Sequence, residues 1–362
     1  MTYALLRRPE TGLGRPMALL GWSAVGLGLL AFLLGLVLGR PDAVFAALDA
    51  SWLFFAGLAA GGVALAAAFL LTGGRWAEPL VPIALACEAF FAPALGLLAV
   101  LLLGARHLFP WAAASGATRL LGAGIRLIVA TGALFALGRR LAERARRSHP
   151  AARERGSAAV LYVLAYAVVL SLWAFELVME LAGGPPATVL PAYYFLGAFL
   201  SGLSWVALVA TLRGAADGDA RHDLGKLLFG FIVVWSYLLW ALFLATWYAN
   251  VPEESVLLLR RWRGPWRPVS GAVLVAVFAW PFWLLFSERL KRRRGTLALG
   301  AATILLGLWG ERFLLVLPSL RLEGGAVALA LGAGVSLGVA GLFLLSFGAR
   351  LAAAGESRAP GG

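Results

Sequence analysis

Apolar residues occur in ten long stretches along the chain, and short polar segments separate them. Each stretch has roughly the length of a helix that crosses a bilayer, about 17–25 residues. Apolar and polar positions do not alternate within the stretches, so membrane-spanning β-strands are not expected. We predict ten transmembrane helices, near residues 17–39, 51–71, 80–104, 119–137, 157–182, 187–212, 224–249, 268–287, 297–317 and 325–348.

The apolar content of the chain indicates that the bilayer is the solvent of these helices. Hydrophobic residues make up 61% of the 362 residues and charged residues 14%, and a soluble core could not bury so much apolar surface. Lipid offers no partner to a bare backbone N–H or C=O group, which leaves helices as the spanning elements. The expected fold class is all-α and polytopic, with residues 1–362 forming a single integral membrane domain.

The net charge of +13 indicates orientation in the membrane and not nucleic-acid binding. The arginines lie mostly in short loops between spans, where the positive-inside rule applies. Most basic residues fall at the two termini and in even-numbered loops, so we expect both termini in the cytoplasm. The largest exception is the loop after the seventh span, which places four arginines outside: Arg260, Arg261, Arg263 and Arg267. Either this segment binds lipid headgroups or an acidic partner, or the span count is wrong.

The chain has few residues that could hold a redox cofactor or a metal ion. It contains one cysteine, Cys87, and three histidines, His107, His149 and His222. Iron–sulfur clusters need several thiolates, c-type haem needs a Cys-x-x-Cys-His attachment, and membrane b-type haem usually needs paired histidines in facing helices. No phosphate-binding glycine loop or metal-ligand spacing is evident. We expect no cofactor bound by this chain, which leaves binding, ion or proton movement, or scaffolding.

Several ionisable residues fall inside the predicted spans, where a charge costs a few kcal/mol unless it pairs, protonates or meets water. They are Glu88, Arg126, Glu176, Glu180, Glu311 and Arg312. Glu176 and Glu180 share a helix face, where two carboxylates favour a shared proton. Alternatively, Glu180 is hydrated at the helix end and Glu176 pairs with Arg126. For Glu311 and Arg312, the simplest interpretation is a local ion pair near the outer interface.

The seventh span carries a polar and aromatic stripe along one face. With about 100° of rotation per residue, four residues fall within roughly 40° of Lys226: Val233, Tyr237, Trp240 and Tyr248. Trp247 lies just outside this arc, and Trp235 lies on the opposite face. The aromatic residues of this span therefore do not form a uniform ring around the helix.

Lys226 is unusual because the chain has only two lysines, Lys226 and Lys291, among its 31 basic residues. A buried lysine can lose and relay a proton, whereas arginine cannot readily do so. Asp223 lies one turn earlier, and His222 titrates near neutral pH. Either these residues take up protons, or they form an ordinary interfacial helix start at which Lys226 extends toward water.

Residues 222–255, HDLGKLLFGFIVVWSYLLWALFLATWYANVPEES, resemble the hallmark helix of the F membrane subunit of alternative complex III. That complex is a bacterial quinol:electron-acceptor oxidoreductase. Further similar segments follow in the same order: SWLFFAGLAAGG at 51–62, LTGGRW at 71–76, RHLFPW at 106–111, LWAFELVMEL at 172–181, YYFLGAFLSG at 193–202 and ERLKRR at 288–293. The similarity covers roughly residues 15–320. The chain departs from the family where Glu176 replaces the usual Asp and where GGPPATV occupies 183–189.

The resemblance implies two four-helix bundles, formed by spans 2–5 and 6–9, with two flanking helices, as in the NrfD/polysulfide reductase membrane subunits. It also implies a location in the bacterial cytoplasmic membrane. The implied partners are a C-type membrane subunit, an iron–sulfur subunit and a multihaem cytochrome subunit, which carry the electrons to cytochrome c or a terminal oxidase. The small-molecule ligand that the resemblance implies is a quinone, either menaquinone or ubiquinone.

Three functional hypotheses follow. The first is a non-redox subunit of the quinol-oxidising complex with a proton half-channel through His222, Asp223, Lys226, Tyr237, Glu176 and Glu88. The second is a quinone-binding subunit of the same complex, whose site would be lined by Trp240, Trp247 and Tyr248. The third is an independent transporter, although paired broken helices that would mark a substrate site are not evident.

Overall fold

The computed structural model describes residues 14–109, 112, 117–146, 152–182, 189–249, 258–320 and 325–356. Within these ranges the chain forms helices joined by short turns, and ten spans are long and apolar enough to cross a membrane. The prediction of an all-α polytopic membrane protein is therefore confirmed.

The described residues form the following helices and helical turns, some of which lie between the spans. They are α1 Gly14–Val37, α2 Pro41–Thr72, η1 Arg75–Ala77, α3 Val81–Ala86, η2 Cys87–Phe90, α4 Phe91–Leu103, α5 Ala105–Leu108, α7 Ala117–Arg146, α8 Ala152–Trp173, η3 Ala174–Met179, α9 Glu180–Ala182, α10 Leu190–Arg213, α11 Gly218–Ala249, α13 Trp266–Leu274, η4 Val275–Ala279, α14 Trp280–Phe286, α15 Glu288–Arg292, α16 Arg294–Val316, η5 Leu317–Ser319 and α17 Gly325–Glu356.

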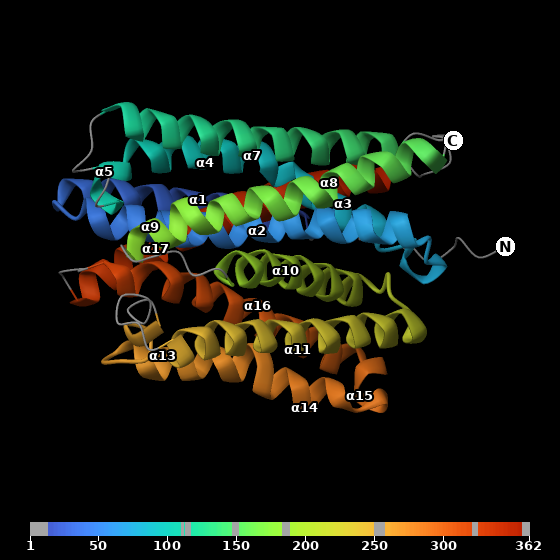
Figure 1. Cartoon of the computed structure of the whole chain (residues 1–362). Helices are drawn as coiled ribbons and strands as arrows, with labels where there is room; N and C mark the ends of the chain where they lie inside the picture. The colour runs from blue at the N-terminus through green and yellow to red at the C-terminus, as the bar shows by residue number, and fades with distance from the viewer. Residues whose placement is uncertain are drawn as a thin grey trace.

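The long helices lie side by side in two groups (Figure 1). In the first group α2 packs against α3, α4 and α8, and α7 packs against α4 and α8. In the second, α10 packs against α11 and α16, and α14 packs against α11 and α16. The groups meet where α2 packs against α10 and α16, while α1 and α17 pack together against α2. This grouping agrees with two four-helix bundles and two flanking helices.

Glycines allow the two bundles to approach closely. A Cβ atom at Gly202 of α10 would lie 2.3 Å from the backbone nitrogen of Gly62, and one at Gly61 would lie 2.2 Å from the Ala198 carbonyl oxygen. Small residues are the usual means by which membrane helices pack, since lipid provides no hydrophobic force between them. The same device joins α1 to α17 at Gly28 and Gly338.

Two boundaries differ most from the sequence prediction. Helix α2 begins at Pro41 and not near residue 51, and α7 continues to Arg146 and not to 137. Pro41 suits the first turn of a helix, where the missing N–H is not needed. The extension of α2 adds Asp49 to the buried part of the span, which matters for the site below.

Two spans are interrupted near a proline. The third span contains a 3-10 turn, η2, just before Pro93, and the eighth contains a wider π-helical turn, η4, just before Pro281. Proline removes the N–H that would bond the carbonyl four residues earlier, so the helix adjusts there. In the third span this turn contains Glu88.

Candidate functional site: charged groups within and at the end of the helix bundles

The polar and aromatic stripe of α11 forms one face of the helix, as predicted, but that face is on the outside of the protein. Tyr237, Trp240, Trp247 and Tyr248 are 56–84% exposed, whereas Trp235 on the opposite face is 1% exposed. The side chains of Trp240, Trp247 and Tyr248 therefore do not enclose a quinone ring within this chain. Large aromatic side chains on such a face suit contact with lipid or with another membrane subunit.

His222, Asp223 and Lys226 belong to a network of ion pairs at the end of the bundle where α11 begins, which we call the Lys226 end. Lys226 Nζ lies 3.0 Å from Asp223 Oδ1, and His222 Nε2 lies 3.9 Å from Glu288 Oε1. Arg292 of α15 is 2.6 Å from Asp219 Oδ1 and 3.2 Å from Glu288 Oε1. The network joins α11 to α15.

The pKa values of two side chains of α15 are shifted by this network and by burial. The hydrogen bond from Arg292 holds the pKa of the Glu288 carboxyl below its ordinary value, and the charge of His222 acts in the same direction. Burial lowers the pKa of the Lys291 ammonium group, and the charge of Lys226 lowers it further. The Lys226 end is thus a surface on which charges of both signs are coupled.

The other residues of the predicted proton path lie apart from this end network. Glu176 in η3 pairs with Arg126 of α7, with Arg126 Nη2 2.5 Å from Glu176 Oε1. Glu88 in η2 pairs with Arg146 and Arg350 at 3.0 and 2.8 Å. Figure 1 shows α7 near one edge of the molecule and α11 near the other, with α2 and α10 between them. The structure does not connect the predicted residues into one path; their role stays a prediction.

The pairing of Glu176 with Arg126 agrees with one of the two sequence interpretations. The Glu176 side chain is 13% exposed and that of Arg126 is 59% exposed, so one member of the pair reaches the surface. Glu176 lies in a π-helical turn, a feature that often occurs at functional positions.

A second charged group lies between the two bundles, toward the end of the bundle opposite Lys226. We call it the inter-bundle cluster, and it consists of Asp49, Tyr193, Tyr194, Arg261, Glu311 and Arg312. Glu311 Oε2 and Arg312 Nη1 lie 3.0 Å apart, and the two side chains are 4% and 1% exposed. The predicted local ion pair is present, and it is buried in the protein.

The surroundings of Arg312 are fitted to its guanidinium group. The group lies over the ring of Tyr194, with Cζ 4.3 Å from the ring centroid, and Nη2 donates a hydrogen bond to the Tyr194 carbonyl oxygen at 3.3 Å. A Cβ atom at Gly197 would lie 2.8 Å from Arg312 Nη2, so a larger residue there would require the guanidinium group to shift.

Arg261 reaches the same cluster from the loop that precedes α13. Its Nε donates to the Leu314 carbonyl oxygen at 2.7 Å, and Nη2 donates to that of Leu315 at 3.3 Å. Burial lowers the pKa of Arg261 to about 10, and the Glu311 carboxylate opposes this shift. This pairing accounts for one of the arginines in the exceptional outer loop: Arg261 binds the end of α16, while Arg260, Arg263 and Arg267 are exposed.

Several polar atoms of the cluster have no hydrogen-bond partner among the described residues. They include both carboxylate oxygens of Asp49 and of Glu311, and Nε of Arg312. The Tyr193 hydroxyl lies near enough to Glu311 to interact with it, without the geometry of a full hydrogen bond. Buried polar atoms without a protein partner commonly bind ordered water.

Asp49 is the residue that sequence reasoning missed. It is fully buried, one turn before Leu53, whose carbonyl oxygen accepts a hydrogen bond from the Tyr194 hydroxyl at 3.1 Å. The predicted span began at residue 51 and so excluded it. Pro41 followed by Asp42 is a helix-start pattern that could have placed Asp49 well inside the helix.

No family model matches the chain, and no curated protein is significantly similar to it.

Proposed function

We propose that the chain is a non-redox integral membrane subunit of a respiratory quinol-oxidising complex of the alternative complex III type, and that it handles protons within the bilayer. In this proposal it is part of a quinol:cytochrome c or quinol:terminal oxidase oxidoreductase in the bacterial cytoplasmic membrane, with both termini cytoplasmic. A C-type membrane subunit, an iron–sulfur subunit and a multihaem cytochrome subunit carry the electrons.

Membership is supported by the resemblance of residues 222–255 and by the arrangement of the spans. The resemblance implied two four-helix bundles with two flanking helices, and α2 and α10 are the helices through which two such groups pack. The exposed aromatic face of α11 offers a surface for a neighbouring membrane subunit. Lipid is the other partner that such a face accommodates.

The proton role rests on one observation, which is the buried and incompletely bonded carboxyl groups of the inter-bundle cluster. A charged side chain within a membrane protein is costly unless it pairs, protonates or meets water. Asp49 has no cationic partner among the described residues. A carboxyl group in this setting, beside tyrosine hydroxyls, is suited to take up and release a proton.

Membership is tested by purification from native membranes. A tag on the chain should retain, in mild detergent, a multihaem cytochrome with its haem c absorbance and a protein containing iron and acid-labile sulfide. The purified assembly should oxidise quinol. Recovery of the chain alone from membranes that still contain an active quinol-oxidising complex would refute membership.

The proton role is tested by Asp49→Asn in the intact complex. The substitution keeps the shape of the side chain and removes the exchangeable carboxyl proton, so the number of protons translocated per electron should fall while quinol oxidation persists. Asp42→Asn is the matched control, since Asp42 lies on the same helix but is 61% exposed. Equal ratios in the wild type and in Asp49→Asn would overturn the proton role and leave membership standing.

Two alternative functions, a quinone-binding subunit and an independent transporter, are tested by different experiments. A quinone site formed by Trp240, Trp247 and Tyr248 would need a second subunit to close over the exposed face of α11, and photo-crosslinking with an azido-quinone would identify it. An independent transporter should transport its substrate in proteoliposomes that contain this chain alone.

A further inference from the structure

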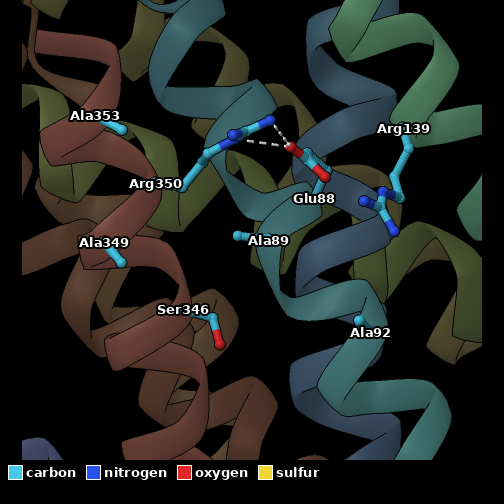
Figure 2. A pocket seen from close by; sticks show the side chains of 8 residues that line it. All are labelled: Glu88, Ala89, Ala92, Arg139, Ser346, Ala349, Arg350 and Ala353. Atoms are coloured by element: carbon cyan, nitrogen blue, oxygen red, sulfur yellow. Dashed lines mark hydrogen bonds and ion pairs between the residues drawn. The ribbon is translucent and has the colours of Figure 1, made fainter. Parts of the chain in front are cut away.

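An open pocket lies between the third, fourth and tenth spans at the Lys226 end of the bundle. It has a volume of about 350 Å³ and is lined by residues of η2, α4, α7 and α17: Glu88, Ala89, Ala92, Arg139, Ser346, Ala349, Arg350 and Ala353. In Figure 2, Arg350 and Arg139 lie on opposite sides of Glu88. The pocket is therefore an open site with a guanidinium group on each side of the carboxylate.

The charges of this pocket do not balance. Glu88 Oε1 accepts hydrogen bonds from Arg350 Nε at 2.9 Å and from Arg146 Nη2 at 3.0 Å, and Arg350 Nη2 lies 2.8 Å from the same oxygen. Arg139 also lines the pocket, whereas Arg146 does not. The lining therefore contains two arginines and one carboxylate, which is an excess of one positive charge.

An ion pair that served only to neutralise Glu88 would need one arginine. Glu88 itself is buried, with a side chain 6% exposed, whereas the side chains of Arg146 and Arg350 are 36% and 40% exposed. A guanidinium group has five N–H donors, and Glu88 uses only part of those on Arg350. The remaining donors are available to a tetrahedral oxyanion, which can accept several hydrogen bonds.

The pocket lies toward the ends of the fourth and tenth spans, where we expect the headgroups of the bilayer. Arg146 is the last residue of its span, and Arg350 lies three residues before the end of the span at Ala353. The Lys226 end is also the side expected to face the cytoplasm, where basic pockets between transmembrane helices bind anionic headgroups. The alanines at 89, 92, 349 and 353 keep the space open between the arginines.

We propose that this pocket binds the phosphate group of an anionic phospholipid, with Arg139 and Arg350 as its ligands and Glu88 holding Arg350 and Arg146 in place. The acyl chains would follow the outer surface of the helices into the bilayer. Free inorganic phosphate has the same headgroup chemistry and is the competing source of the oxyanion. The inference does not depend on the proposed respiratory role.

The test is native mass spectrometry of the full chain in detergent, titrated with phosphatidylglycerol or with phosphatidylcholine. Phosphatidylglycerol should be retained more strongly, and Arg139→Gln should weaken its binding about fivefold, as expected for one basic side chain near an anionic headgroup. Arg140→Gln is the matched control, because Arg140 is the exposed neighbour of Arg139 on α7 and does not line the pocket. Equal losses in the two variants would overturn the proposal.

A second pair of variants leaves every charge in place. Ala349→Leu fills the pocket and should reduce phosphatidylglycerol binding, whereas Ala352→Leu, also exposed on α17 but outside the pocket, should not. A competition series with inorganic phosphate separates the two sources. Displacement of the lipid only at high phosphate supports the headgroup; binding of phosphate with no preference for phosphatidylglycerol over phosphatidylcholine overturns the lipid site.

Discussion

Two ion pairs of this protein have the same separation and opposite surroundings. Arg312 Nη1 lies 3.0 Å from Glu311 Oε2, and Lys226 Nζ lies 3.0 Å from Asp223 Oδ1. The side chains of the first pair are 1% and 4% exposed, and those of the second are 56% and 32% exposed. Distance alone therefore says nothing about the consequence of either pair.

The two pairs differ in how much hydration the side chains lose when the pair forms. Glu311 and Arg312 have lost water, and the ring and carbonyl of Tyr194 and the nearby Arg261 replace only part of it. Burial of charges at this cost is poor evidence of a contribution to stability and more consistent with a specific role. Asp223 and Lys226 keep much of their hydration, and an exposed pair of this kind contributes little.

The largest expected effect comes from removing one member of the buried pair. Arg312→Leu leaves the Glu311 carboxylate without its nearest cation, which costs about 3–5 kcal/mol for buried pairs in proteins. The midpoint of thermal unfolding in detergent should fall strongly, with a loss of monodisperse protein on size-exclusion chromatography. A midpoint near that of the wild type would show that Glu311 is already neutral or solvated.

The double variant Glu311→Leu/Arg312→Leu sharpens this result. Replacing both members of a buried ion pair by apolar residues is often neutral or stabilising, so the double variant should recover most of the stability lost by Arg312→Leu. If the double variant is no better than the single one, Arg312 acts mainly through its contact with Tyr194.

An intermediate effect is expected at the contact between the bundles. A Cβ atom at Gly202 would meet backbone atoms of Gly61 and Gly62, which cannot rotate away, so Gly202→Ala should destabilise the protein by about 1–3 kcal/mol. Gly230→Ala is the matched control on peripheral α11, where a Cβ atom meets nothing within 4 Å. Alanine there should be neutral or stabilising by roughly 0.5–1 kcal/mol, and equal effects at both sites would contradict the close packing of α2 and α10.

The number of spans was predictable from the sequence, whereas the helix at the centre of the fold was not. The sequence predicts ten spans because each one is apolar over a bilayer's length, and most predicted ends lie within a few residues of the observed ones. Apolarity does not tell which span is central, since lipid-facing and buried helices are equally apolar. Of the most apolar 18 residues of α2, 83% are buried, against 22% in α11. The useful signal is side-chain size, with Gly57, Gly61 and Gly62 in α2 and large aromatic residues in α11.

The candidate site was predictable only as a set of isolated charges. Glu88, Glu176 and Glu311 were found because an acid in a span is rare, and the pairing of Glu176 with Arg126 was one of the expected interpretations. The partners Arg146 and Arg350 of Glu88 are 58 and 262 residues away in sequence. Sequence spacing within one helix cannot reveal such contacts, because they depend on how three helices pack.

The smallest expected effect belongs to the exposed pair. Lys226→Met removes an i,i+3 pair at the surface, which is worth roughly 0.2–0.5 kcal/mol, so the thermal midpoint should be nearly unchanged. Asp223→Asn should behave in the same way, as it removes the same contact. A loss of more than about 1 kcal/mol in Lys226→Met alone would mean that Lys226 stabilises more than its partner Asp223.

Function separates the two interpretations of Lys226 more sharply than stability does. The Lys226→Met complex should be assayed for quinol oxidation and for proton translocation. If both are unchanged, Lys226 is a surface residue that extends toward water, and protons reach the interior elsewhere. If translocation falls while quinol oxidation persists, the ion-pair network of α11 and α15 supplies protons despite its exposure. Because Lys226 is exposed, such a loss could not be attributed to a damaged core.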